Sequence, residues 1–170
     1  GGSFMENKIF APWRMAYILS NSDDNEQKAP GCIFCEFPKM NEDEKNLILH
    51  RGKECFVILN AFPYNPGHLM VVPYSHTADL PGLTPSELSE MMSLCQTAHS
   101  VITEVMKPHG FNMGMNLGKV AGAGIDQHLH MHVVPRWNGD TNFMPVLGEV
   151  RVVSEALNST WKRLREKWPE

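Results

Sequence analysis

Three histidines at alternate positions, His128, His130 and His132, are the residues of this chain best suited to chemistry. In a β-strand the three imidazoles would share one face, while Leu129 and Met131 would point to the other. A core position would be costly, because each imidazole has two ring nitrogens to satisfy and an unpaired buried polar group costs about 1–3 kcal/mol. A neutral imidazole can instead attack phosphorus to form a phosphoramidate, and a second imidazole can donate to a phosphate oxygen. The row therefore predicts a phosphate-handling site rather than a solvated polar face.

A glycine-rich segment, residues 117–126, comes directly before the histidines. Gly122 and Gly124 let the backbone come close to a ligand, and successive backbone N–H groups can bind phosphate oxygens. Ordinary turns have the same composition, so the segment takes its meaning from its position. We expect it to lie beside the phosphate.

Two of the four cysteines, Cys32 and Cys35, have the spacing C-x-x-C. A disulfide framework is not expected, because the sequence shows no secretory signal. The pair could bind a metal, form a redox couple or stay reduced without a metal. The redox alternative ranks last, because residues 21–30 look like a loop and a thioredoxin-like motif lies between a strand and a helix. Cys55 and Cys95 fit small buried hydrophobic positions.

Hydrophobic patterns predict the strands that must position these residues. Residues 54–60 and 68–73 are rich in β-formers and flank a turn with two prolines and a glycine at residues 61–67. They predict an antiparallel hairpin. Residues 111–116 and 128–135 predict two further strands, and the second of these carries the histidines.

The clearest helix is predicted for residues 85–106. Thr84 can cap it, Pro85 suits its first position and Glu87 completes a capping box. A second helix is predicted for residues 148–168. Apolar residues at helical spacing predict one buried face on the first helix: Leu88, Met91, Met92, Cys95, Ala98, Val101, Ile102, Val105 and Met106. The fold class is therefore α+β, an antiparallel sheet with a long helix packed on it and a C-terminal helix.

Length and charge narrow the class of protein. The chain has 170 residues, 42% of them hydrophobic, and a formal net charge of -4. We expect a single domain over residues 5–170, preceded by a cloning remnant at residues 1–4. The acidic balance argues against duplex nucleic acid as a partner, and the longest apolar runs are far too short to cross a membrane. Because no signal peptide is visible, the expected location is the cytoplasm.

Residues 128–134 have the pattern His-φ-His-φ-His-φ-φ, in which φ is apolar, and the run resembles the histidine triad (HIT) superfamily of nucleotide hydrolases and transferases. Residues 60–73 are similar to the nucleotide-binding hairpin of that family. The similarity continues through residues 135–137, 139–145 and 13–15, which look most like the branch that contains bacterial diadenosine tetraphosphate phosphorylases. The resemblance covers almost the whole chain and implies the HIT-like fold.

The resemblance also implies a role for individual residues. His130 would attack the α-phosphate and carry the nucleotidyl group, and His132 would hydrogen-bond the phosphate or the leaving group. His68 would lie under the triad and orient it. Asn60 would hold the ribose hydroxyls, and Asn116 would contact the phosphates or the bridging oxygen, as would the backbone of the glycine-rich segment.

A structural zinc site is implied as well. Several family members are similar in binding zinc through two cysteines, a histidine after the hairpin and the first triad histidine. Cys32, Cys35, His76 and His128 fill these positions, one zinc per chain. A structural zinc site is closed by four protein ligands, so His128 would be a ligand rather than a catalytic base.

The implied activity is cleavage of diadenosine tetraphosphate or a related adenine nucleotide through a nucleotidyl-histidine, in a homodimer as is typical of the family. Many hydrolytic members carry Gln four residues before the triad, where this chain has Gly124, and Gln127 stands directly before it. This departure leaves room for phosphate as the acceptor. Two alternatives stay open: a nucleoside phosphoramidate or adenylyl-conjugate hydrolase, and a nucleotide-binding regulatory protein with little turnover.

Arg136 could bind a distal phosphate or form a structural ion pair.

Overall fold

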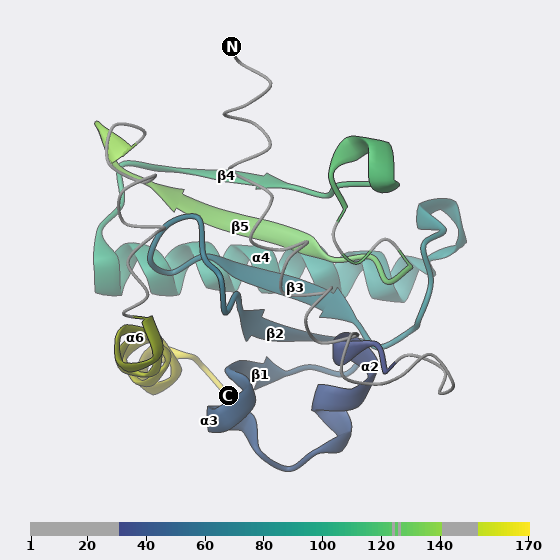
Figure 1. The fold of residues 1–170 in the computed structure, drawn as a ribbon, viewed down its shortest axis with the longest axis horizontal. Helices are drawn as coiled ribbons and strands as arrows, with labels where there is room; N and C mark the ends of the chain where they lie inside the picture. Colours follow the sequence, from purple (N-terminus) through teal and green to yellow (C-terminus); the bar gives the residue numbers. More distant parts are fainter. Residues whose placement is uncertain (1–30, 124, 126, 141–152) are drawn as a thin grey trace.

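The computed structural model describes residues 31–123, 125, 127–140 and 153–170. Within them, the strands form one antiparallel sheet in the order β1-β2-β3-β5-β4 (Figure 1). The strands are β1 (Ile48–Arg51), β2 (Cys55–Leu59), β3 (Leu69–Pro73), β4 (Gly110–Gly114) and β5 (Met131–Arg136). The helices are α2 (Ile33–Glu36), α3 (Asp43–Asn46), α4 (Pro85–Met106) and α6 (Val153–Lys167), with 3-10 turns η1 (Phe37–Lys39), η2 (Leu80–Gly82) and η3 (Lys119–Ala121). The predicted α+β class is confirmed.

The predicted hairpin is the centre of the sheet. β2 and β3 pair in regular register from Cys55 opposite Pro73 to Leu59 opposite Leu69. The connection needs glycine at Gly67, whose φ is +85° and whose Cβ would come within 2.8 Å of Met106 Sδ. Another residue there would be strained in its backbone, and its Cβ would require Met106 to move, so glycine is favoured at this turn.

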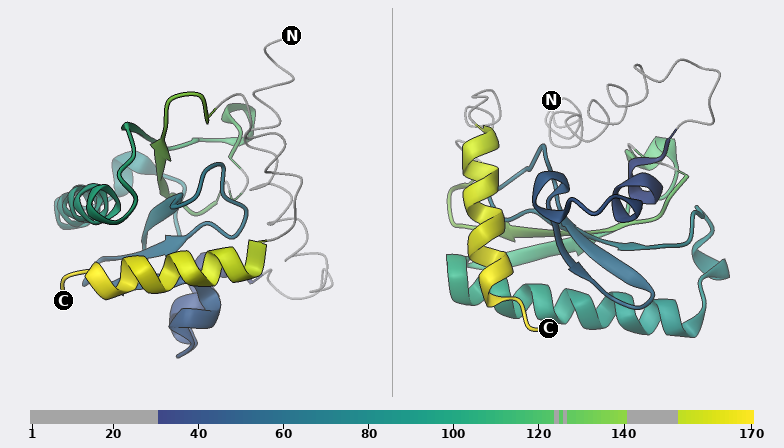
Figure 2. Two further views of the ribbon diagram at one scale, coloured as in Figure 1. Left: turned by 90° about the vertical axis from the view of Figure 1, so that its left-hand side faces the viewer. Right: turned by 90° about the horizontal axis from the view of Figure 1, so that it is seen from below.

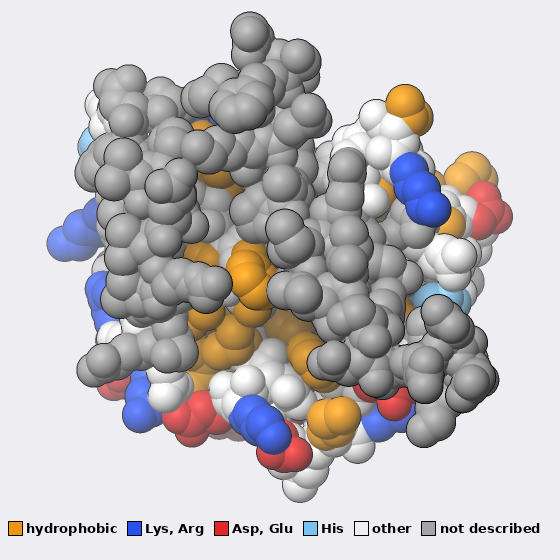
Figure 3. Space-filling view, in the orientation of Figure 1, with side chains coloured by type: hydrophobic (Ala, Val, Ile, Leu, Met, Phe, Trp, Pro, Cys, Tyr) orange, Lys and Arg blue, Asp and Glu red, His pale blue; other side chains and the backbone are white. Residues whose placement is uncertain are grey.

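Both faces of the sheet are covered, because alternate side chains of β2 enter two different cores. Val57 and Leu59 belong to the core that includes the buried face of α4, whereas Phe56 and Ile58 pack with Phe34 of α2. Figure 2 shows α4 on one face and the short helices α2 and α3 on the other. Figure 3 looks at the face away from α4, where hydrophobic side chains gather over the middle of the sheet.

Helix α4 begins with the predicted capping box. Thr84 Oγ1 accepts a hydrogen bond from the Glu87 N–H at 3.0 Å, and the Glu87 carboxylate accepts one from the Thr84 N–H at 2.8 Å. The prediction of burial was wrong for Leu88 and Met92, which are 41% and 54% exposed. Both lie on the flank of the buried face, which is narrower than the apolar pattern suggests. The buried apolar residues are Met91, Leu94, Cys95, Ala98, Val101 and Ile102.

The strand predicted for residues 128–135 starts later than expected. β5 begins at Met131, which lies opposite Val71 of β3. The residues before it pair with the chain beyond β3 instead, since the Leu129 N–H donates to the carbonyl of Thr77 at 2.9 Å. His128 and His130 therefore belong to an extended lead-in to the strand, and of the three histidines His132 alone is in β5.

The C-terminal helix is confirmed as α6, which runs across the β1 side of the sheet at one end of α4 (Figure 2). Trp161 Nε1 donates to the carbonyl of Ile48 at 2.8 Å, and Leu164 and Trp168 enter the core beside α4. Among the described residues, no helix has the length and apolar character needed to cross a bilayer. The predictions made for residues 1–4, 13–15 and 141–145 fall outside the described residues.

The Thr84→Ala variant should lower the free energy of unfolding by about 1 kcal/mol, because the first turn of α4 loses the acceptor for the Glu87 N–H. Urea unfolding at neutral pH measures this difference. Ser93→Ala, which removes an exposed hydroxyl from the same helix, is the matched control and should change stability by less than about 0.5 kcal/mol. Equal midpoints for Thr84→Ala and the wild type would contradict the role given to the cap.

Candidate active site

The three histidines lie on the face of the sheet that α2 covers. His132 is opposite Met70, a member of the core around Phe34. The intervening Leu129 enters the core beside α4, and the intervening Met131 packs against that core. The rings of His130 and His132 are 4.7 Å apart, edge to face. The predicted division between an imidazole face and an apolar face therefore holds, although the strand itself begins at Met131.

His130 has one ring nitrogen committed to the backbone. Its Nδ1 lies 2.9 Å from the carbonyl oxygen of His128, an acceptor, so Nδ1 carries the proton and Nε2 carries the lone pair. Burial lowers the pKa of His130 to about 4, which keeps the ring neutral near pH 7. Phe34 packs on it with ring centroids 4.9 Å apart, and 5% of the residue is exposed. The ring is therefore a neutral imidazole with its lone pair on Nε2, packed beside Phe34.

His68 and His132 form a hydrogen-bonded pair next to His130, and the donor and acceptor of that bond can be assigned. The Tyr64 N–H donates to His68 Nδ1 at 3.0 Å, so neutral His68 carries its proton on Nε2. That nitrogen lies 3.2 Å from His132 Nδ1, which must then accept, leaving the proton of His132 on Nε2. Burial lowers the pKa of His68 to about 3 and that of His132 well below its usual value, with further lowering by the neighbouring histidines. Both rings are therefore neutral near pH 7.

The four residues expected to hold zinc come together at the start of the triad. The ligand atoms of Cys32, Cys35, His76 and His128 all lie within 4.8 Å of one another. His76 Nδ1 is 3.3 Å from His128 Nδ1, and Cys35 Sγ is 3.2 and 3.6 Å from these two nitrogens. Tetrahedral zinc at its usual bond lengths places two nitrogens about 3.3 Å apart and a nitrogen and a sulfur about 3.5 Å apart. The donor set and its spacing thus fit zinc.

His128 is oriented for this purpose by its second nitrogen. Its Nε2 lies 2.7 Å from the carbonyl oxygen of Pro73, an acceptor, so Nε2 carries the proton and Nδ1 faces the cluster with its lone pair. Hydrogen bonding of the remote N–H to a backbone carbonyl is the usual way in which proteins orient a ligating histidine. A metal in the cluster could therefore use His128 Nδ1 as a ligand.

The residues expected to bind nucleotide have different surroundings. Asn60 is buried at the end of β2, and its Oδ1 accepts a hydrogen bond from the Phe62 N–H at 2.8 Å, which forms a local turn. Asn116 Nδ2 is buried and, among the described residues, has no hydrogen-bond partner, as suits a group that binds a ligand. Gly122 has φ +95° at the end of η3. Gly124 lies outside the described residues.

Arg136 forms the structural ion pair that was one of its two predicted roles. Its Nε and Nη2 donate to the carboxylate of Asp140 at 2.6 and 2.8 Å. The guanidinium also lies over the ring of Tyr64, 5.2 Å from the centroid. Asp140 and Tyr64 were not singled out from the sequence, because an aspartate and a tyrosine in loops carry no motif that marks them.

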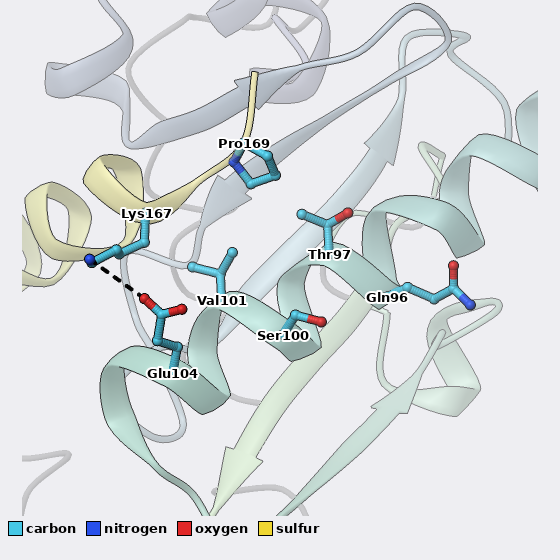
Figure 4. Close-up of a pocket in the computed structure, with 7 residues that line it drawn as sticks. All are labelled: Gln96, Thr97, Ser100, Val101, Glu104, Lys167 and Pro169. Carbon is cyan, nitrogen blue, oxygen red and sulfur yellow. Dashed lines mark ion pairs between the residues drawn. The ribbon is translucent and has the colours of Figure 1, made fainter.

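The hollow drawn in Figure 4 lies away from the histidines, between α4 and the C-terminal end of the chain. Its volume is about 380 Å³, and it contains an ion pair between Lys167 and Glu104 at 3.6 Å. Its lining contains no imidazole or thiol: Gln96, Thr97, Ser100, Val101, Glu104, Lys167 and Pro169. The histidine triad and the Cys/His cluster therefore do not line this hollow.

Alternate histidines on one face of an antiparallel sheet, with a Cys/His cluster at the first of them, define a histidine triad protein. Comparison with known proteins agrees. The HIT domain matches residues 41–139. The chain is 43% identical over 164 residues to AP-4-A phosphorylase of Mycobacterium tuberculosis, covering 95% of this chain and 84% of that protein. The chain belongs to the HIT family of nucleotide hydrolases and transferases.

More distant relatives share the domain. The chain is 31% identical over 107 residues to the asymmetrical bis(5'-nucleosyl)-tetraphosphatase of Schizosaccharomyces pombe, covering 63% of this chain and 56% of that protein. The fold of this chain is similar to the crystal structure of a zinc-bound histidine triad family protein from Mycobacterium smegmatis, with a TM-score of 0.64 and 27% sequence identity. The match covers 80% of this chain and 91% of that protein. That relative was crystallised with zinc bound.

The low pKa of His68 should make folding stability depend on pH. The unfolded chain takes up this proton near pH 6.5 and the folded protein near pH 3, so stability is lost as the pH falls between these values. At pH 5 the loss from His68 alone is on the order of 2 kcal/mol. Urea unfolding of His68→Gln at pH 7.5 and 5 should show a decline smaller than that of the wild type by this amount.

The metal ligands are intact in both proteins, so their response to pH cancels in that comparison. Equal declines for the wild type and His68→Gln would contradict the neutral, buried state of His68.

Proposed function

We propose that this protein cleaves diadenosine tetraphosphate through a nucleotidyl-histidine formed on His130. The observation that carries the proposal is the hydrogen bond from His130 Nδ1 to the carbonyl of His128, which leaves Nε2 as a neutral nucleophile. The relative named AP-4-A phosphorylase, 43% identical over almost the whole chain, supports this substrate. The asymmetrical tetraphosphatase from Schizosaccharomyces pombe supports the same substrate class.

In the first step, the lone pair of His130 Nε2 attacks the α-phosphorus. A P–N bond forms, and the P–O bond to the bridging oxygen breaks, so that ATP leaves with the electron pair of that bond. In the second step, an oxygen of the acceptor attacks the same phosphorus and the P–N bond breaks, which returns neutral His130. Phosphate as acceptor gives ADP, and water gives AMP with its proton released to solvent. Such a double displacement replaces one difficult step by two easier ones.

His132 is suited to stabilise the charge that develops on the phosphate. Its hydrogen bond with His68 places the proton of His132 on Nε2, and a neutral N–H donor in dry surroundings binds a phosphate oxygen strongly. Asn116 Nδ2, a buried donor with no partner among the described residues, supplies a second contact to the phosphates or the bridging oxygen. Asn60 binds the ribose, and the backbone at Gly122 and Gly124 binds the phosphate.

We propose phosphate as the natural acceptor, because Gly124 stands where many hydrolytic relatives carry Gln. We also propose that the enzyme is a cytoplasmic homodimer, as the family resemblance implies.

Zinc is proposed as a structural ion held by Cys32, Cys35, His76 and His128. Bound there, zinc would join α2 to the first triad histidine. This chain's own contribution is the cluster geometry and the bond from His128 to Pro73, which fix the start of the triad segment. The backbone that positions His130 is continuous with that start, because the acceptor for His130 Nδ1 is the His128 carbonyl.

Incubation of the purified protein with diadenosine tetraphosphate should give ADP and ATP in the presence of phosphate. His130→Ala should lower turnover by at least about 1000-fold, because it removes the nucleophile. His99→Ala, an exposed histidine of α4, is the matched control and should retain wild-type turnover. Product separation by chromatography measures both results. Undiminished turnover in His130→Ala would contradict the mechanism, and phosphate-independent release of AMP would favour water as the acceptor.

The metal content of the purified protein should be one zinc per chain, as measured by plasma mass spectrometry. Cys35→Ser should weaken binding, because a hydroxyl is a poor substitute for a thiolate at zinc. Cys95→Ser changes a buried thiol in the core beside α4 and should retain the wild-type zinc content. Equal zinc content in all three proteins would contradict the proposed ligand set.

A further inference from the structure

A chain of buried polar contacts connects the turn after β5 with the triad. Asp140 is 6% exposed, and its Oδ2 accepts hydrogen bonds from Arg136 Nε at 2.6 Å, Asn65 Nδ2 at 2.8 Å and the Trp137 N–H at 3.1 Å. These bonds lower the pKa of Asp140, so the carboxylate stays charged across the neutral range. The carboxylate is a fixed acceptor for the side chain of Asn65.

Asn65 is 1% exposed, and its surroundings determine its orientation. Nδ2 donates to the carbonyl of Pro135 at 2.7 Å and to Asp140, so both amide hydrogens meet acceptors and a flipped amide would lose both bonds. The backbone carbonyl of Asn65 accepts from the His68 N–H at 3.1 Å. Pro66 and Gly67, the latter at φ +85°, fill the two central positions of this turn.

The same turn presents the Tyr64 N–H to His68 Nδ1 at 3.0 Å, and Arg136 lies over the ring of Tyr64. As long as that N–H points at Nδ1, the proton of His68 must sit on Nε2. His68 Nε2 then donates to His132 Nδ1, which places the proton of His132 on Nε2. The position of this proton therefore depends on a turn whose anchor is Asn65.

We propose that Asn65, held by Asp140, is a positioning residue that sets the tautomers of His68 and His132. This proposal rests on the proposed function, because it affects turnover through the hydrogen bond that His132 Nε2–H donates to a phosphate oxygen. The other tautomer would direct a lone pair at an anion and repel it. Asn65 touches no substrate in this account and acts through Tyr64 and His68.

The test measures both the tautomers of the histidines and the steady-state kinetics. Long-range ¹H–¹⁵N spectra of the ¹⁵N-histidine-labelled, zinc-loaded protein at pH 7.5 report which ring nitrogen of each histidine carries the proton. In the wild type we expect His68 and His132 to be protonated on Nε2. In Asn65→Ala we expect a mixture of tautomers and a fall in kcat of about 10- to 100-fold with KM little changed. A loss of stability alone would not change the tautomers of the folded fraction.

Asn112→Ala is the matched control, because exposed Asn112 accepts a hydrogen bond from Arg136 Nη1 but has no contact with Asn65. It should retain the wild-type tautomers and kcat. A wild-type spectrum and kcat in Asn65→Ala would overturn the proposal. So would a proton on Nδ1 of either ring in the wild type, a result that does not depend on the folding of any variant. If the wild type cleaves no dinucleotide, the proposed function fails, while the spectra still decide the tautomers.

Discussion

A buried neutral imidazole has one proton, so the partner of one ring nitrogen determines what the other nitrogen can do. In the proposed mechanism that rule gives His128, His130 and His132 three different roles. A carbonyl on His128 Nε2 leaves Nδ1 for a metal, and a carbonyl on His130 Nδ1 leaves Nε2 as a nucleophile. His68 receives an N–H on Nδ1 and so makes His132 a donor. Burial supports these assignments, because it disfavours the charged imidazolium, in which both ring nitrogens carry a proton.

The two covered faces of the sheet place the histidines beside these hydrogen-bond partners. Helix α4 covers one face of the sheet and α2 the other, so alternate residues before and within β5 enter different cores. On the α2 side, His128 lies against Cys32 and Cys35, and His130 packs on Phe34. The late start of β5 also matters for the ring of His130. Strand pairing would occupy the backbone groups of residues 128–130, whereas the observed lead-in uses the carbonyl of His128 for the ring of His130.

Much of this arrangement follows from local patterns. The hairpin, the capping box of α4 and the shared face of the histidines all depend on neighbouring residues, so periodicity and turn chemistry predicted them. The short helix α2 and the strand β1 were missed, because they are stabilised by contacts with residues far along the chain, such as Phe34 with His130 and Ile48 with Trp161. The roles of Asn65 and Asp140 could not be predicted either, since their contact joins positions 75 residues apart.

In the proposed mechanism His130 becomes covalently bonded to the nucleotide. This bond can be detected by rapid quenching of the enzyme with diadenosine tetraphosphate in the absence of phosphate, followed by digestion under alkaline conditions and mass spectrometry. We expect one adenylyl group on the peptide that contains His130, and its loss when phosphate is added before quenching. An unmodified protein during active turnover, or an adenylyl group on any other residue, would contradict it.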